Sequence, residues 1–233
     1  MRFRITTLGG MVCLMLAAVV WSQDAAMPDD SDVSTGIQLR SNGQLAIGPI
    51  TAEIAHYADD WSETMQHDAY TPKASPATQP GAFVLDGPFA LSSDTFNLTE
   101  RITPDNGGIH YVASVTSDKA VDTKELSLQL QLSTDDFGGK QVTIDQDEVK
   151  LPTDAQPKGQ AQLAAKNGVH EIDIPVSNGT LMISSSGGMD IYLQDNREWD
   201  DDHFGLRIHF SPVDGQIKSS ALDLEMKVKP AGK

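Results

Sequence analysis

Hydrophobic and polar residues alternate along much of the chain. Every second residue from Leu126 to Leu132 is leucine, with Ser or Gln in between, and the stretch from Leu222 to Val228 alternates apolar residues with Asp, Glu and Lys. Successive side chains of a strand point to opposite faces of a sheet, so this pattern predicts β-strands that bury one face.

A further alternating segment, Asp190 to Phe210, predicts two strands joined by a polar loop. Apolar residues occupy every second position from Phe204 to Phe210, which places Arg207 and His209 on the opposite face. We expect these two residues to form an exposed basic pair. The simplest role for Arg207 is a cross-strand salt bridge with an acidic neighbour, and the alternative is a contact with a ligand.

Turn residues separate the predicted strands. Asn42-Gly43 and Asn178-Gly179 are of the types that form tight hairpin turns. Strands that alternate in this way belong to antiparallel sheets with one solvated face. Residues 36–230 are therefore predicted to form one all-β domain, an antiparallel two-sheet β-sandwich with a jelly-roll-like arrangement.

Two segments are less regular. Residues 50–66 predict a strand over 50–57 and then an irregular piece that carries Trp61, but their apolar spacing also fits a helix. Residues 71–81 contain three prolines and no apolar periodicity, so we expect a loop there.

The N-terminus has the pattern of a secretory signal peptide over residues 1–22. Arg2 and Arg4 precede an apolar core, and Ser22 fits the residue before the cleavage site. Residues 23–35 are small and acidic, which predicts a disordered lead-in. These features predict a secreted or periplasmic protein with no membrane insertion after cleavage.

The net charge and the cysteine content limit the kinds of partner that the protein is expected to bind. Without the two arginines of the signal segment, the chain carries about 18 more acidic than basic residues, and its single cysteine, Cys13, lies in that segment. A strongly acidic surface argues against nucleic acid as a partner, and suits neutral sugars or divalent cations. The alternative interpretation is that the negative charge only keeps a secreted protein soluble.

Exposed aromatic residues are the candidates for a sugar-binding platform, because a sugar ring stacks on an aromatic ring while polar groups fix its hydroxyls. Trp199 lies in a polar loop with Asp195, Asn196 and Arg197, which we predict to contact a polysaccharide or oligosaccharide. Trp61 is a second predicted ligand-binding residue. The alternative for each Trp is a plug at the edge of the fold. Further aromatic candidates are Tyr57, Tyr70 and Tyr192.

The same loop suggests calcium as the one candidate cofactor. Calcium takes six to eight oxygen ligands, and Glu198, Asp200, Asp201 and Asp202 supply several carboxylates. The run lacks the spacing of an EF-hand loop, so the alternative is a solvated acidic turn.

No catalytic residue is predicted. The run from Glu171 to Val176 is similar to the Glu-x-Asp-x-x-Glu strand of laminarinase-like glycoside hydrolases, but Val176 stands where the second glutamate belongs. There is no Gly-x-Ser-x-Gly motif, and the histidines lack the spacing of a zinc site.

A series of short motifs resembles the non-catalytic β-sandwich modules attached to secreted bacterial polysaccharide-degrading enzymes. These motifs are F-x-L-x-G-P-F over 83–89, Asn97 to Glu100, Gly107-Gly108, Asp136 to Gly139, Leu151-Pro152, and Gln194 to Arg197. The resemblance implies an association with carbohydrate metabolism outside the cytoplasm.

Three functions follow as hypotheses. The first is a secreted protein that binds carbohydrate or assists a carbohydrate-active enzyme. The second is a jelly-roll polysaccharide lyase or glycoside hydrolase, which requires His, Tyr, Arg and a carboxylate to converge on a concave face. The third is a structural or protein-interaction domain of the cell envelope.

Overall fold

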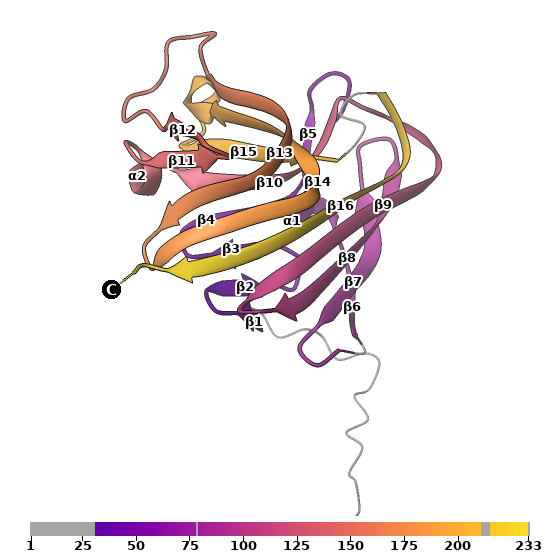
Figure 1. The fold of residues 1–233 in the computed structure, drawn as a ribbon. Coiled ribbons are helices and arrows are strands. Elements are labelled where there is room, and N and C mark those ends of the chain that lie inside the picture. Colours follow the sequence, from indigo (N-terminus) through magenta and orange to yellow (C-terminus); the bar gives the residue numbers. More distant parts are fainter. Residues whose placement is uncertain (1–30, 78, 211–214, 233) are drawn as a thin grey trace, which may run out of the picture.

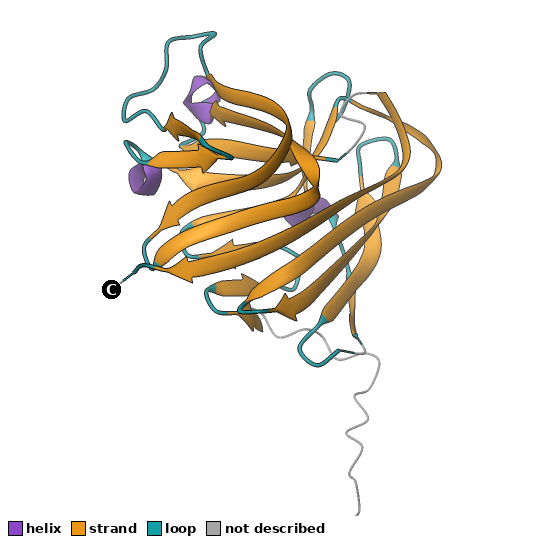
Figure 2. Ribbon diagram, viewed as in Figure 1, coloured by secondary structure: helices purple, strands orange, loops and turns teal. Residues whose placement is uncertain are grey.

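Strands form along almost all of the alternating segments (Figures 1 and 2). The structure, a computed structural model, describes residues 31–77, 79–210 and 215–232. In chain order its elements are β1 (Ser31–Ser34), β2 (Ile37–Leu39), β3 (Leu45–Ile47), β4 (Ile50–Tyr57), β5 (Glu63–Met65), α1 (Gln66–Ala69), β6 (Lys73–Pro76), β7 (Phe83–Ala90), β8 (Thr95–Asp105), β9 (Gly108–Thr123), β10 (Glu125–Ser133), α2 (Thr134–Phe137), β11 (Gln141–Ile144), β12 (Asp147–Lys150), β13 (Gln162–Val176), β14 (Gly179–Asp195), the 3-10 helix η1 (Asn196–Trp199), β15 (His203–His209) and β16 (Gly215–Pro230).

The predicted all-β, antiparallel fold is confirmed. Every pairing between the described strands is antiparallel, and the main path runs β1-β2-β3-β4-β10-β15-β14-β16-β9-β8-β7-β6. The division into two separate sheets is not confirmed, because these strands form one continuous hydrogen-bonded sheet that curls over on itself (Figure 1). The curl brings β1 against β8 and β9.

Strand β14 is where the sheet changes direction. Strand β13 pairs with it at both ends, over 179–184 and 189–194. On its other edge, residues 179–184 pair with β16 and residues 191–195 pair with β15. The register is irregular between Lys166 and Glu171, and the long hairpin bends there (Figure 1). One strand therefore joins the two halves of the curled sheet.

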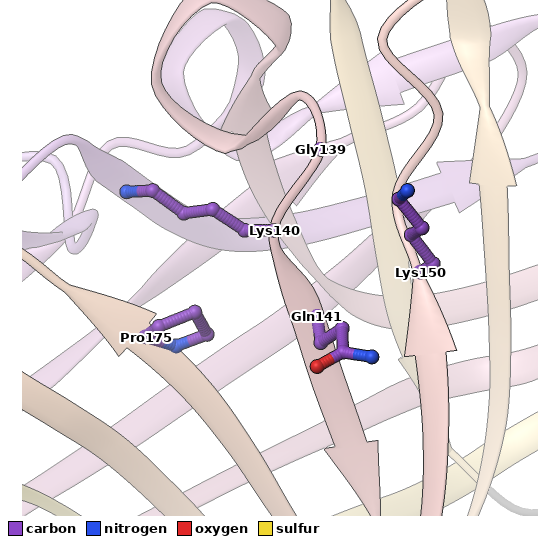
Figure 3. A pocket seen from close by; sticks show the side chains of 5 residues that line it. All are labelled: Gly139, Lys140, Gln141, Lys150 and Pro175. Carbon is purple, nitrogen blue, oxygen red and sulfur yellow. The ribbon is translucent and has the colours of Figure 1, made fainter.

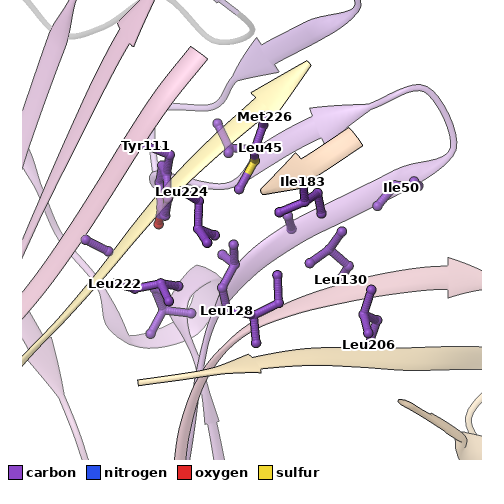
Figure 4. Close-up of a cluster of buried hydrophobic side chains, with 14 of the residues drawn as sticks. Leu45, Ile50, Tyr111, Leu128, Leu130, Ile183, Leu206, Leu222, Leu224 and Met226 are labelled. Atoms are coloured by element: carbon purple, nitrogen blue, oxygen red, sulfur yellow. The ribbon is translucent and has the colours of Figure 1, made fainter. Parts of the chain in front are cut away.

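The inner side of the curled sheet holds one hydrophobic core. Figure 4 shows Leu128 and Leu130 of β10 facing Leu206 of β15, Ile183 of β14 and Leu224 of β16. These residues are almost completely buried. Each comes from an alternating segment, so the same pattern that predicts the strands also supplies the core.

Several local predictions are confirmed. Strands β2 and β3 form a hairpin over Asn42-Gly43, and β13 and β14 form one over Asn178-Gly179. Residues 50–57 are the strand β4, whereas helix in that region is limited to Gln66–Ala69.

Two boundaries differ from the predictions. Residues Lys73–Pro76, expected in a loop, form the edge strand β6 and pair with β7. Proline is tolerated at a sheet edge, where no neighbour needs its missing N–H. Residues Ser31–Ser34, expected in the disordered lead-in, form β1 and pair with β2. The predicted signal peptide and residues 23–30 of the lead-in lie outside the described residues.

A polar cluster lies inside the core, where α1 crosses the edge of β4. The Gln66 side chain accepts a hydrogen bond from the Ile54 backbone N–H and donates one of 2.7 Å to the Glu100 carboxyl. Tyr111 donates a second, of 2.6 Å, to Glu100. Gly43 fits because a Cβ there would lie 2.2 Å from both Gln66 and Glu100. Burial raises the pKa of Glu100 to about 8, so this carboxyl is mainly protonated at neutral pH.

None of the helices among the described residues is long and apolar enough to span a membrane.

Candidate ligand-binding site

The outer side of the strands β4, β10, β15 and β14 carries a connected set of polar and aromatic side chains. The register places Gln129 of β10 opposite Arg207 of β15, and Arg207 opposite Tyr192 of β14. Tyr57 of β4 lies opposite Glu125 at one end of β10. Because side chains alternate between the faces of a sheet, these residues all point away from the core.

Arg207 is at the centre of this set. The prediction that it is exposed is wrong, because its side chain is buried. Its side chain and that of Glu125 are both only 7% exposed, and Arg207 Nη1 lies 2.8 Å from Glu125 Oε2. Ser127 donates a further hydrogen bond to Glu125. The alternating pattern predicts on which face of the sheet a side chain lies, but it does not predict whether other side chains cover it. Here neighbouring side chains cover the Arg207 guanidinium. The predicted pairing of Arg207 with an acidic neighbour is confirmed.

Two tyrosine rings flank the Arg207 guanidinium. Its central carbon lies 5.0 Å from the ring centre of Tyr57 and 5.3 Å from that of Tyr192, which is cation–π distance. The Tyr57 hydroxyl lies within hydrogen-bond distance of Glu63, at 2.5 Å, and of Gln129, at 3.0 Å. Burial raises the pKa of Tyr57 above its usual value. The phenol is therefore neutral at physiological pH.

Trp61 extends this surface beyond the edge of the sheet. Its ring is 57% exposed and lies edge-on to Tyr57, with 6.2 Å between ring centres. Its φ angle is +65°, a conformation that bulky residues rarely adopt. We call the surface formed by Tyr57, Trp61, Glu125, Gln129, Tyr192 and Arg207 the Arg207 face.

Within the part of the chain that the structure describes, two buried nitrogen atoms at the Arg207 face have no hydrogen-bond partner. They are Arg207 Nε and His209 Nε2. His209 Nε2 lies 3.5 Å from Glu125 Oε1, which is too long for a well-formed hydrogen bond. Buried polar atoms without a partner are uncommon in folded proteins, and a functional role is one explanation for them.

The predicted contact loop is instead tied into the protein. Asp195 is 1% exposed and accepts two hydrogen bonds from the Arg197 side chain, both 2.8 Å. Arg197 also donates to the backbone carbonyls of Pro152, Thr153 and Asp154. These hydrogen bonds anchor the 152–154 loop, and contact of the two residues with a ligand stays a prediction.

Asn196 and Trp199 differ in exposure. The Asn196 side chain is buried against Gly205 and accepts a hydrogen bond from Gln194. Trp199 is 58% exposed, as predicted, but it precedes His203, which lies opposite Ser133 at the far end of β10. Glu125 and Ser133 are roughly 25 Å apart along the strand. The two exposed tryptophans therefore do not share one site.

The acidic residues predicted to hold calcium do not gather. Glu198 accepts a hydrogen bond from the Gly159 backbone N–H, while Asp201 contacts His203 at 2.6 Å. Asp200 adopts a left-handed backbone conformation after η1, and Asp202 follows in the same turn. Within the described ranges, no group of three or more His, Cys, Asp or Glu side chains is arranged to hold a metal. Calcium binding stays a prediction.

Other candidates lie apart from the Arg207 face. Tyr70, an aromatic candidate from the sequence, is buried and donates its hydroxyl hydrogen to the Leu98 carbonyl. A shallow hollow lies between β11, β12 and the end of β13, lined by Lys140, Lys150, Gln141 and two further residues. The two lysine side chains extend from opposite sides of Gln141, and their ammonium groups do not face one another (Figure 3).

Sequence reasoning identified the aromatic residues of the Arg207 face but missed Glu125 and Gln129. The alternation of β10 contains the signal, since Ser127, Gln129 and Gln131 share the face opposite its leucines. Comparison with known proteins adds nothing to this set, because no family model and no curated protein matches the chain.

Proposed function

We propose that the protein is a secreted carbohydrate-binding or accessory protein that holds a polysaccharide on the Arg207 face. The observation that carries the proposal is the stack of Tyr57, Arg207 and Tyr192 beside the exposed ring of Trp61. Aromatic faces give a sugar ring an apolar surface, and the amide and hydroxyl groups between them bind its hydroxyls. From β4 to β14 the face spans three strand spacings, roughly 14 Å, enough for a short oligosaccharide.

The backbone at Trp61 supports a functional role for this residue. A large residue in the left-handed conformation costs on the order of 1–3 kcal/mol, and such strain is found at ligand-binding positions. The turn from Ala58 to Ser62 would accept Gly or Asn at lower cost. Besides its contacts with Tyr57 and Lys124, the exposed ring offers a stacking surface for a ligand.

Replacing Trp61 by Gly tests the proposal. We expect the affinity for polysaccharide to fall at least tenfold, because a stacking surface is lost. The free energy of unfolding should stay within about 1 kcal/mol of the parent, since relief of the backbone strain offsets the lost contact with Tyr57. Affinity gel electrophoresis measures the first quantity and thermal unfolding the second.

Trp199→Ala is the matched control, because Trp199 is equally exposed at the other end of β10. It should bind as the parent does. If Trp199→Ala loses binding while Trp61→Gly keeps it, the ligand lies on the η1 loop and the proposal for the Arg207 face is wrong.

A second candidate function is cleavage of a polysaccharide. It is favoured by the convergence of Tyr57, Glu125, Arg207 and His209, the residue types expected of a lyase on such a sheet. They lie on the outer side of the sheet, however, while the concave inner side is filled by Leu and Ile. The raised pKa of Tyr57 also disfavours a phenolate base.

Incubation with polysaccharides distinguishes the two candidates. Binding alone leaves the polymer length unchanged and produces neither unsaturated nor reducing ends. New chain ends that appear with the parent and disappear with His209→Ala would favour cleavage.

A further inference from the structure

We infer that the Arg207 face selects neutral polysaccharides over those that contain uronic acids. This inference rests on the proposed function and names the ligand class of the same site. It follows from how the charges of the face are paired, from the charges at its rim, and from the groups left to contact a ligand.

The positive charge of Arg207 is already compensated. Its guanidinium contacts the Glu125 carboxylate at 2.8 Å, and both side chains are 7% exposed. A uronate could bind Arg207 in two ways: by burying its own carboxylate at Arg207 Nε, beside the Glu125 carboxylate, or by displacing Glu125 from Nη1. Both are costly, because the first buries a second negative charge next to Glu125 and the second leaves Glu125 without its counter-charge.

The rim of the face is acidic on the side of Trp61. Asp59, Asp60 and Glu63 are all exposed within two residues of the tryptophan. Lys124 lies 5.8 Å from the centre of the Trp61 ring and supplies one positive charge nearby. A polymer with a carboxylate on every sugar would meet more negative than positive charge here, and exposed charges of like sign repel.

The remaining groups suit sugar hydroxyls. On the outer side of β10, Gln131 presents a half-buried side-chain amide, while Gln129 is buried and bonded to the Tyr57 hydroxyl. Tyr57 and Tyr192 supply phenolic hydroxyls. Amides and hydroxyls both donate and accept hydrogen bonds, as sugar hydroxyls do. The rings of Tyr57, Tyr192 and Trp61 add apolar surface for the C–H face of a sugar ring.

The test is affinity gel electrophoresis of residues 23–233 in gels with one polysaccharide each. The neutral series is a β-glucan, a xylan and a glucomannan, and the acidic series is polygalacturonate and alginate. Each gel is run at low and at physiological salt. We expect at least one neutral polymer to retard the parent protein, with less than a twofold change between the salts, and the acidic polymers to cause none.

Three variants tie the result to the Arg207 face. Trp61→Gly should reduce the retardation by the neutral polymer at least tenfold, and Trp199→Ala should preserve it. Tyr192→Ala gives a second test on the opposite side of Arg207 and should also weaken binding. Thermal unfolding of each variant verifies that it is folded.

The outcomes separate the inference from the proposed function. Retardation by an acidic polymer that depends on Trp61 and fades with salt would overturn the neutral selectivity but uphold carbohydrate binding by this face. Absence of retardation in every gel would overturn the proposed function itself.

Discussion

A Glu100→Gln variant is expected to lack most of the decrease in stability that we expect of the parent protein between pH 6.5 and 8. Glu100 is completely buried, and burial raises its pKa to about 8 in the folded state. The unfolded chain has an ordinary carboxyl, so between its pKa and 8 the folded state binds one more proton. Stability from Glu100 is then full below the unfolded pKa and is lost as pH rises, at roughly 1.4 kcal/mol per pH unit.

His56 has the opposite effect over part of this range. Burial lowers its pKa to about 4, so its contribution is present above pH 6.5 and is lost as pH falls towards 4. The two effects oppose each other below pH 6.5. The clearest loss from Glu100 therefore falls between pH 6.5 and 8, where we expect a decrease of about 2 kcal/mol.

Urea unfolding from pH 5 to 9 measures this difference between the variant and the parent. Glu171→Gln is a suitable control, because Glu171 is exposed on β13. It should follow the parent curve at every pH. Equal slopes for Glu100→Gln and the parent above pH 6.5 would show that the Glu100 carboxyl is already ionised in the folded protein.

The second large effect is expected from Arg207→Met, which should destabilise the protein by roughly 3–5 kcal/mol. The substitution keeps much of the side-chain volume but leaves the buried Glu125 carboxylate without its cation. In the parent, burial favours a higher pKa for Glu125, but the contacts with His209 and Arg207 outweigh it and keep the pKa below its usual value. Without Arg207, that pKa should rise.

A double-mutant cycle with Glu125→Gln checks the cause. If the cost comes from the unpaired carboxylate, adding Glu125→Gln to Arg207→Met should recover much of the lost stability. Stability that falls by the sum of the two single effects would mean that Arg207 acts mainly through its packing between Tyr57 and Tyr192.

The strands were predictable because alternation is a local property. The alternation of leucine with Ser and Gln in β10 predicts a buried face without any knowledge of the strands that pair with it. Strand β6 was not predicted because the prolines in and around it are typical of a loop. Its strand conformation depends on its pairing with β7, which the local sequence does not indicate. Asp195 could have been placed correctly, since Ile191, Leu193 and Asp195 share one parity and the first two are core residues.

The Arg207 face could be predicted only in part. The aromatic residues stand out in the sequence, and the alternation of β15 puts Arg207 on the outer side. The partner that fixes its charge, Glu125, is 82 positions away, and no local pattern connects the two. The separation of Trp61 from Trp199 likewise depends on strand order, which periodicity does not contain.

The position of β16 has a consequence for how the chain acquires its structure during synthesis. This strand is the last in chain order, yet it lies in the interior of the sheet, between β14 and β9. Until it emerges, the long strands β9 and β14 each present a bare hydrogen-bonding edge, the kind of surface through which nascent chains aggregate. Between the completion of β9 and the synthesis of β16, the sheet is therefore open to misassembly through these edges.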